Sequence, residues 1–209
     1  MTGNVIGKNA STVAETILYL HGFRSSPASF KARLLAERMT GLGRGADYYC
    51  PQLPASPREA IEVALQLVRR VAPGKLTLIG SSLGGFYTNW LAEKLGCRAV
   101  LLNPAVKPWR GLQQHVGVTA AYHSDERFEF KAEYIEELKQ LDVPEITDPE
   151  RYFLVAATGD EVLDWREMVA QYPGARHRVI AGGDHGLSDF GEYMDEVLAF
   201  CGVDAKGAQ

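Results

Sequence analysis

Three short stretches of the sequence carry side chains that could together perform nucleophilic catalysis. They read GSSLGG at 80–85, TGDE at 158–161 and AGGDHG at 181–186. A serine hydroxyl needs a base to remove its proton, and an imidazole can do so near neutral pH. The imidazole in turn needs a carboxylate, which fixes its tautomer and stabilises the cation. In chain order, the three stretches therefore supply a nucleophile, an acid and a base.

The serine stretch fits the pattern G-x-S-x-G, in which the serine occupies a sharp turn between a strand and a helix. Ser82 is the serine of this pattern, and Gly80 and Gly84 flank it where larger side chains would collide with the turn or a neighbouring strand. At the N-terminus of the following helix, the dipole and the free N–H groups favour developing negative charge. Ser81 comes one residue too early. We therefore expect Ser82 to be the nucleophile, against the alternative of a turn serine that only caps the helix.

An oxyanion needs two backbone donors close to the nucleophile. The residue after the nucleophile supplies one of them in such turns, here the N–H of Leu83. The other is expected from the loop after the first predicted strand, where His21-Gly22-Phe23 resembles the HG motif of such enzymes. We assign it to the N–H of Phe23.

Five histidines compete for the role of the base. His21 belongs to the oxyanion-loop motif, where we expect it to make structural hydrogen bonds. His177 lies inside a predicted strand rather than at its carboxyl end, and His115 and His123 fall in an irregular segment. His185 follows the end of a strand, and we expect it to be the base.

The acid has four candidates in the sequence. Asp160 comes first in the turn after its strand, where a short carboxylate could reach the loop of His185, and Glu161 is the reserve. Asp164 precedes a predicted helix with a capping-box acid in place, so it reads as an N-cap. Asp184 adjoins His185, so its side chain would usually point away from the ring. We expect Asp160 to be the acid.

The elements that must position these residues alternate between short apolar runs and longer amphipathic stretches, as in a parallel sheet covered by helices. Strands are predicted at 16–20, 47–50, 75–79, 98–102, 151–157 and 176–180. Helices are predicted at about 27–39, 82–95, 165–171 and 189–200, and a further helix begins at 57. Ligands in such sheets bind beyond the carboxyl ends of the strands, where the three stretches lie. We predict one α/β domain over 1–209, with a mostly parallel sheet of about six strands flanked by helices.

Two helix starts carry local signals. Ser26 is the expected N-cap of the first helix, which would have Phe30 in its apolar stripe. Ser56 is the expected N-cap of the second, with Pro57 at the first position and Glu59 at the third.

Between residues 105 and 150 the alternation weakens, which predicts a small cap inserted beside the sheet. Trp109, Leu112, Val116 and Tyr122 could line an acyl pocket there, or could be the apolar side of a cover over the sheet. Residues 130–141 read as one surface helix, with Phe130 on its apolar stripe.

Composition excludes several classes of protein. The 209 residues carry a net charge of −4, so no global basic field favours nucleic acid or an anionic membrane. We expect no membrane span, because about 18 apolar residues never run together, and no signal peptide in residues 1–14. The isolated cysteines Cys50, Cys97 and Cys201 suit a reducing compartment and a cytoplasmic protein, and argue against a zinc site or disulfides.

The chain also resembles a known family in the stretches YLHGF at 19–23, GSSLGG at 80–85, TGDEVLD at 158–164 and GGDHGLSDF at 182–190. The order serine, acid, histidine is that of the α/β-hydrolases. These stretches look like those of the YqiA-like esterases, which are small α/β-hydrolases with little cap, and the similarity covers nearly the whole chain.

The resemblance implies hydrolysis of acyl esters or thioesters with Ser82, Asp160 and His185 as the triad. Arg24 departs from the family, where a small polar residue such as Asn is common. This cation beside the oxyanion loop could attract acidic substrates or lie on the surface.

From the sequence we predict a serine hydrolase that cleaves small-molecule acyl esters or thioesters through an acyl-enzyme intermediate, without a metal or organic cofactor. One alternative is a non-catalytic binding protein on the same fold, whose mark would be loss of a triad member, and none is missing. Another is acyl transfer or C–C bond hydrolysis on the same scaffold. Nothing in the sequence indicates an oligomeric state.

Overall fold

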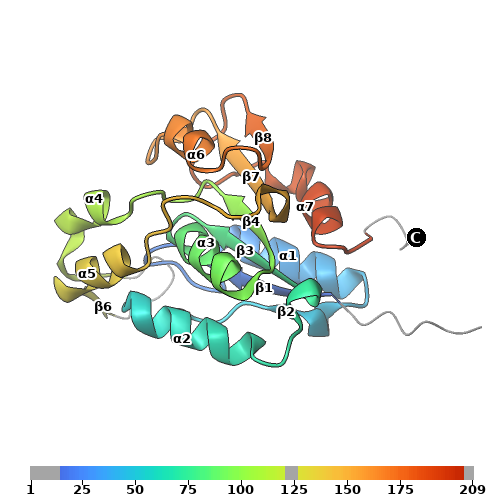
Figure 1. The fold of residues 1–209 in the computed structure, drawn as a ribbon, viewed down its shortest axis with the longest axis horizontal. Helices are drawn as coiled ribbons and strands as arrows, with labels where there is room; N and C mark the ends of the chain where they lie inside the picture. Colours follow the sequence, from blue (N-terminus) through green and yellow to red (C-terminus); the bar gives the residue numbers. More distant parts are fainter. Residues whose placement is uncertain (1–14, 121–126, 205–209) are drawn as a thin grey trace, which may run out of the picture.

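A parallel sheet of six strands forms the centre of the computed structural model, which describes residues 15–120 and 127–204 (Figure 1). The order is β2-β1-β3-β4-β7-β8, and every neighbouring pair is parallel, which confirms the predicted, mostly parallel sheet of about six strands. The strands are β1 (Thr16–Leu20), β2 (Tyr48–Tyr49), β3 (Leu76–Ser81), β4 (Arg98–Leu102), β7 (Tyr152–Ala157) and β8 (Arg176–Ile180). The strands β2 and β3 lie on opposite sides of β1, so the direction in which the chain adds strands to the sheet reverses there. Such a switch point opens a crevice beyond the carboxyl ends of the strands.

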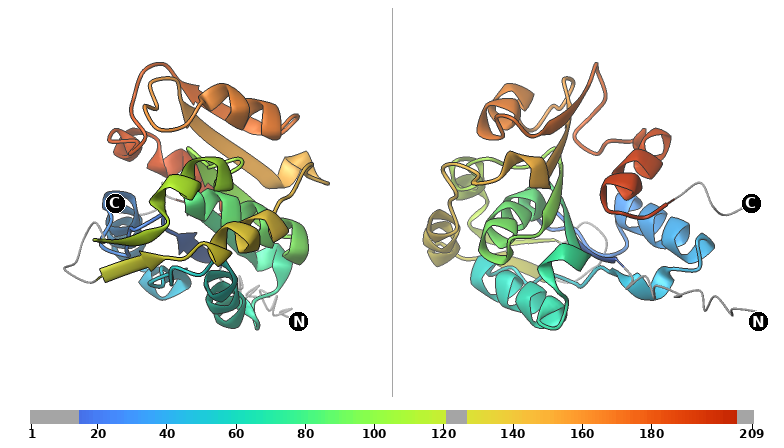
Figure 2. Two further views of the ribbon diagram at one scale, coloured as in Figure 1. Left: turned by 90° about the vertical axis from the view of Figure 1, so that its left-hand side faces the viewer. Right: turned by 45° about the vertical axis from the view of Figure 1, so that its right-hand side comes forward.

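Helices cover both faces of the sheet (Figure 2). The helices α1 (Phe30–Gly41) and α7 (Met194–Phe200) lie on one face, and α2 (Pro57–Val68), α3 (Leu83–Leu95) and α6 (Trp165–Gln171) on the other. Along β1, Leu18 and Leu20 pack toward α2 and α3, whereas Ile17 and Tyr19 pack toward α1 and α7. Strands buried on both faces read as nearly continuous apolar runs, which is why the sequence predicts them well. Within the described residues, none of the helices has both the length and the apolar character to cross a bilayer.

The predicted cap of α2 is confirmed, and that of α1 is wrong. Ser56 accepts a hydrogen bond from the N–H of Glu59 at 3.2 Å, with Pro57 as the first helical residue. By contrast, α1 begins at Phe30 with Ser29 at the N-cap position, while the Ser26 hydroxyl accepts from Ala28 in the exposed turn before it. Phe30 is 48% exposed rather than part of the buried stripe.

The last helix also begins later than predicted. Its expected first turn is a separate 3-10 turn, Phe190–Glu192, and α7 starts at Met194.

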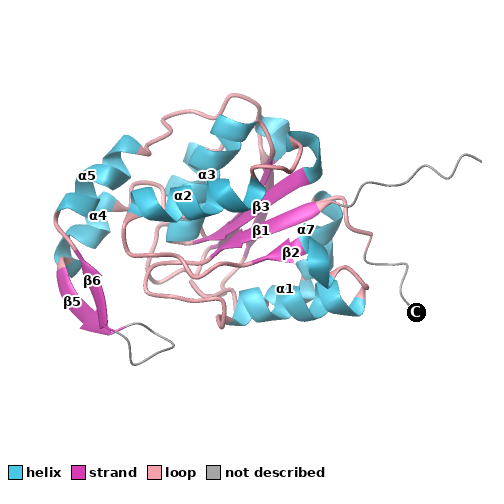
Figure 3. Ribbon diagram, turned by 90° about the horizontal axis from the view of Figure 1, so that it is seen from below, coloured by secondary structure: helices cyan, strands magenta, loops and turns pink. Residues whose placement is uncertain are grey.

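The segment after β4 contains a hairpin that the sequence did not predict (Figure 3). Helix α4 (Trp109–Leu112) is followed by the antiparallel strands β5 (Gly117–Ala120) and β6 (Arg127–Phe130), and then by α5 (Glu133–Gln140). The single helix predicted over 130–141 is therefore too long, because Phe130 ends β6. Phe130 is fully buried, and its ring meets that of Phe23 edge-on at 5.2 Å between centroids. Tyr122 and His123 lie outside the described residues.

Glu93, near the C-terminus of α3, joins that helix to β7. The hydroxyl groups of Tyr152 and Thr147 donate to its carboxylate at 2.5 and 2.7 Å, and the Arg151 guanidinium lies 3.2 Å away. Burial alone would raise the pKa of Glu93. The hydrogen bonds and the Arg151 charge outweigh burial and hold the pKa of this carboxyl below its usual value.

Glu93→Gln should lower the free energy of unfolding by about 1–2 kcal/mol at neutral pH, because a charged acceptor of several hydrogen bonds becomes neutral. Since the folded-state pKa is depressed, the stabilisation is fully present above the unfolded pKa of about 4.3 and is lost as the pH falls through the folded pKa. Urea unfolding between about pH 7 and pH 3 should show the difference from wild type shrinking in acid. The control is Glu62→Gln, on the exposed side of α2. If Glu93→Gln lowered the free energy of unfolding by the same amount at about pH 3 as at about pH 7, the depressed pKa of Glu93 would be contradicted.

Candidate active site

Ser82 occupies a strained turn between β3 and α3. Its φ and ψ are 55° and −120°, a backbone conformation that residues other than glycine rarely adopt. The turn is held in place because the N–H of Ser82 donates to the carbonyl of Leu102 at 3.1 Å, while its own carbonyl accepts from Ala105 at 3.0 Å. The side chain therefore projects from the end of the sheet instead of following the helix.

Two glycines allow this turn. A Cβ atom at Gly84 would lie 2.0 Å from the carbonyl oxygen of Leu20, and one at Gly80 would lie 2.2 Å from the carbonyl oxygen of Gly84. Backbone atoms cannot yield at such distances, so the packing of α3 against β1 and β3 requires glycine at both positions.

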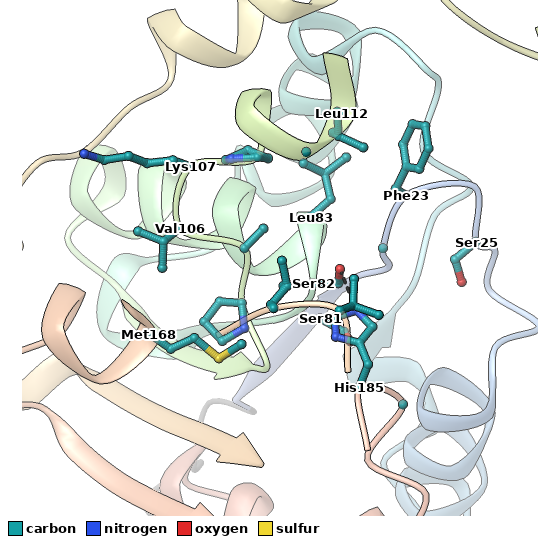
Figure 4. A pocket seen from close by; sticks show the side chains of 18 of the residues that line it. Phe23, Ser25, Ser81, Ser82, Leu83, Val106, Lys107, Leu112, Met168 and His185 are labelled. Atoms are coloured by element: carbon teal, nitrogen blue, oxygen red, sulfur yellow. Dashed lines mark hydrogen bonds between the residues drawn. The ribbon is translucent and has the colours of Figure 1, made fainter. Parts of the chain in front are cut away.

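The structure brings the three predicted residues into one hydrogen-bonded chain. Ser82 Oγ lies 3.0 Å from His185 Nε2 (Figure 4), and His185 Nδ1 lies 2.7 Å from Asp160 Oδ2. With its proton on Nδ1, the ring donates to Asp160 and accepts from the Ser82 hydroxyl. The three side chains come from the carboxyl ends of β3, β7 and β8, where the sequence places them.

Asp160 is held as a carboxylate. Its side chain is fully buried, and its second oxygen accepts from the backbone N–H groups of Val162 and Leu163, both at 2.8 Å. Burial raises the pKa of Asp160, but the hydrogen bonds from His185 and from these two amides outweigh it, so the pKa lies below its usual value. An ionised Asp160 can orient the imidazole and stabilise its cation.

The other three carboxylates have different partners. Glu161 accepts from the backbone N–H of His185 at 3.0 Å, a contact to the main chain that the sequence did not predict. Asp164 accepts from the N–H of Arg166 at 2.9 Å and is the N-cap of α6, as predicted. Asp184 accepts from the N–H and hydroxyl of Ser188, within its own loop.

The remaining described histidines also have partners of their own. Nε2 of the buried His21 accepts from the N–H of Leu53 at 3.0 Å, so its proton is on Nδ1, which faces the carbonyl of Gly22. His177 Nε2 lies 2.7 Å from the carbonyl oxygen of Tyr172. His115 lies on the cavity wall, with its ring tilted against Phe23.

The two expected oxyanion donors come from two different segments beside Ser82. Leu83 is the first residue of α3, and an N–H at that position has no acceptor within its helix. Phe23 follows Gly22, which passes so close that a Cβ there would lie 3.3 Å from that of Ser82. Arg24 continues the loop with a φ of 58°, which Asn adopts more readily than Arg. Arg24 therefore carries backbone strain at this position.

A cavity of about 880 Å³ opens over Ser82 and His185 (Figure 4). Its apolar lining comes from the β1 loop, α3, the cap and α6, and includes Phe23, Leu83, Val106, Leu112, Leu163 and Met168. Of the four cap residues considered from sequence, Leu112 lines the cavity, Trp109 packs edge-on against Phe86, and Val116 is 40% exposed. The cap thus supplies part of the pocket wall and part of the cover over α3.

The model of the uncharacterised protein family UPF0227 matches residues 16–202. The chain belongs to this family. The resemblance to the YqiA-like proteins is thereby confirmed, because UPF0227 is the YqiA-like family.

Solved structures show which fold the UPF0227 chain shares. A protein from Agrobacterium vitis S4 is 19% identical, with a TM-score of 0.70 over 90% of this chain and 88% of that one. Alpha/beta hydrolase domain-containing protein 10 from mouse is 19% identical, with a TM-score of 0.64 over 90% and 88% of the two chains. The esterase domain of a Rhodothermus marinus protein is 18% identical, with a TM-score of 0.63 over 90% and 87%. At these identities the similarity shows the fold, and that fold is the α/β-hydrolase fold.

The titratable side chains of the described residues form no group of three or more His, Cys, Asp or Glu that could hold a metal ion. Cys50, Cys97 and Cys201 are free thiols, and burial raises the pKa of each to about 12. Such thiols are poor nucleophiles near neutral pH.

Gly84→Ala should lower the free energy of unfolding by about 3 kcal/mol or more, because the new methyl group would overlap the backbone of β1. Gly111→Ala is the matched control, since a Cβ there meets nothing within 4 Å. It should leave stability unchanged or raise it by up to about 1 kcal/mol. Denaturant midpoints of both variants measure the effect, and equal midpoints would show that the close approach at Gly84 is not a constraint.

Proposed function

We propose that the protein is a serine hydrolase that cleaves small-molecule acyl esters or thioesters. The observation that carries the proposal is the chain of two hydrogen bonds, 3.0 and 2.7 Å long, that links Ser82 through His185 to Asp160, with Ser82 and His185 lining a mainly apolar cavity. Geometry of this kind is what an activated serine requires: a base on the hydroxyl and an acid on the far nitrogen of the base.

In the proposed reaction, Ser82 Oγ attacks the substrate carbonyl carbon while His185 Nε2 takes the hydroxyl proton. The amides of Phe23 and Leu83 donate to the oxyanion of the tetrahedral intermediate, where one such donor contributes about 3 kcal/mol. His185 then protonates the leaving alcohol or thiol, and the acyl group stays on Ser82. Water, deprotonated by the same histidine, releases the acid and restores the serine. Each step uses only these groups and water.

Two further observations support hydrolysis of an acyl compound. The apolar cavity wall suits an acyl group, and a protein named as an esterase domain shares the fold. A protein that only bound ligands would not need a nucleophile in a strained turn, because such strain costs about 1–3 kcal/mol and tends to persist where function uses it.

The three free cysteines fit a reducing compartment such as the cytoplasm.

Ser82→Ala should abolish covalent labelling by a fluorophosphonate probe and lower hydrolysis of p-nitrophenyl butyrate at least about a thousandfold. Intact and peptide mass spectrometry on wild type should find a single adduct on Ser82. Ser81→Ala, one residue earlier in the chain, is the control and should still be labelled. Failure of folded wild-type protein to react with the probe would sink the proposal.

Asp160→Asn should lower kcat by about 10³- to 10⁴-fold, because the amide no longer stabilises the imidazolium. Glu161→Gln keeps an acceptor for the backbone N–H of His185 and should lower kcat less than about tenfold. Steady-state kinetics on the same ester compares the two. The reverse ranking would move the role of the acid to Glu161.

A further inference from the structure

The loop that carries His185, residues 181–188, is flexible in sequence at one end and strained in conformation at the other. Gly182 and Gly183 have a positive φ, which glycine adopts readily, whereas Leu187 has a φ of 52° with a bulky side chain. Within the loop, the main support is the Asp184 side chain, which accepts from Ser188. Such a loop needs contacts from outside to hold one geometry.

Asn103, just past the end of β4, supplies contacts to two carbonyls of the loop. Its amide nitrogen donates to the carbonyl oxygens of Asp184 at 3.0 Å and of His185 at 3.2 Å. Its amide oxygen accepts from the N–H of Ala157 at 2.8 Å, at the end of the strand that leads to Asp160. Asn103 is fully buried and has a φ of 43°. The side-chain amide of Asn103 thus connects the end of β7, which precedes Asp160, with the loop that carries His185.

Lys31, on α1, supplies the contact to the next carbonyl. Its ammonium group donates to the carbonyl oxygen of Gly186, and the residue is only 8% exposed. No carboxylate of the described residues makes an ion pair with it within 4.0 Å, so this carbonyl is its chief polar contact in the protein. Burial lowers the pKa of Lys31 to about 8, although the charges of Asp184 and Asp160 oppose the shift. The amine keeps N–H donors in both protonation states.

We propose that Asn103 and Lys31 are positioning residues for His185, and that together they clamp the three successive carbonyls of residues 184–186. The inference rests on the proposed function, since it assigns these residues to the base of that reaction. The clamp acts on the main chain at and beside His185, while Glu161 holds its N–H. The ring can then meet Ser82 and Asp160 at the same time. A displacement of about 1 Å in a catalytic group is enough to lower a rate about a hundredfold.

The test uses Lys31→Met and Asn103→Asp in the full chain. Methionine keeps the length of the lysine stem and removes the donor, so the variant should fold. Aspartate keeps the shape and the acceptor for Ala157 but loses both donations to the loop; if it does not fold, Lys31→Met alone decides. Lys94→Met is the matched control, because Lys94 is also a helical lysine but is exposed and does not line the cavity.

We expect kcat on p-nitrophenyl butyrate to fall about tenfold to a hundredfold in Lys31→Met and Asn103→Asp, with KM changed less than about twofold. The rate of fluorophosphonate labelling should fall by the same factor. The downfield proton resonance of the His185–Asp160 hydrogen bond should broaden or shift, which a mere loss of stability in a still-folded protein would not cause. Lys94→Met should match wild type in all three.

Several results would overturn the clamp. Folded Lys31→Met and Asn103→Asp with wild-type kcat and an unchanged resonance would show that His185 needs no outside support. A raised KM with unchanged kcat would make Lys31 a substrate-binding residue. An equal loss of kcat in Lys94→Met would show that removal of a lysine charge, and not the contact to Gly186, lowers the rate. If wild type itself is not labelled at Ser82, the proposed function fails; if wild type is labelled and the variants equal it, only the clamp fails.

Discussion

The close approach of α3 to the ends of β1 and β3 is the constraint on which the site depends. Because Gly80 and Gly84 carry no side chains, the start of α3 can lie against the carbonyl oxygens of Leu20 and His21. This contact forces the chain to turn at Ser82 with a positive φ, which directs the hydroxyl away from the sheet. It also brings the β1 loop, with Gly22 and Phe23, beside Ser82. A single packing requirement therefore creates the strained turn at Ser82 and places the candidate oxyanion donor Phe23 next to it.

Backbone strain in the described residues is concentrated around this point. The four residues other than glycine with a positive φ are Arg24, Ser82, Asn103 and Leu187, and each lies in a loop that follows a strand end and borders the site. Such conformations cost about 1–3 kcal/mol each and persist only where the surroundings over-determine them. Here a sheet buried on both faces supplies the surroundings, because its two apolar layers hold the strand ends in fixed positions.

The sequence predicted the features that leave a local pattern. Strands buried on both faces appear as apolar runs, and the capping residues Ser56 and Asp164 act on amides only two or three residues away. Phe130 was misassigned because its place in β6 depends on pairing with Gly117, which no helical periodicity reveals, although the alternation RFEF at 127–130 is a strand pattern. The starts of α1 and α7 were also wrong by a few residues, as helix ends depend on tertiary contacts.

In the site, too, the residues that follow a local rule could be predicted, and those that act through long-range contacts could not. Ser82, Asp160 and His185 follow strand ends, so chain order and the rule for parallel sheets were sufficient to predict that they meet. Nothing in the sequence singles out Asn103 or Lys31 as part of the site. Their contacts to the His185 loop span 81 to 155 residues of chain and leave no local pattern.

The kind of support for each site residue changes with its distance from the sheet. Ser82 comes one residue after β3, and backbone hydrogen bonds to Leu102 and from Ala105, beside the neighbouring strand, hold it. Asp160 comes three residues after β7, and its carboxylate is held by two amides of its own turn. His185 comes five residues after β8, beyond two glycines, and its main chain is held by side chains from three other parts of the fold. Because each added residue of loop adds backbone freedom, the base is the member of the site whose geometry depends most on residues outside it.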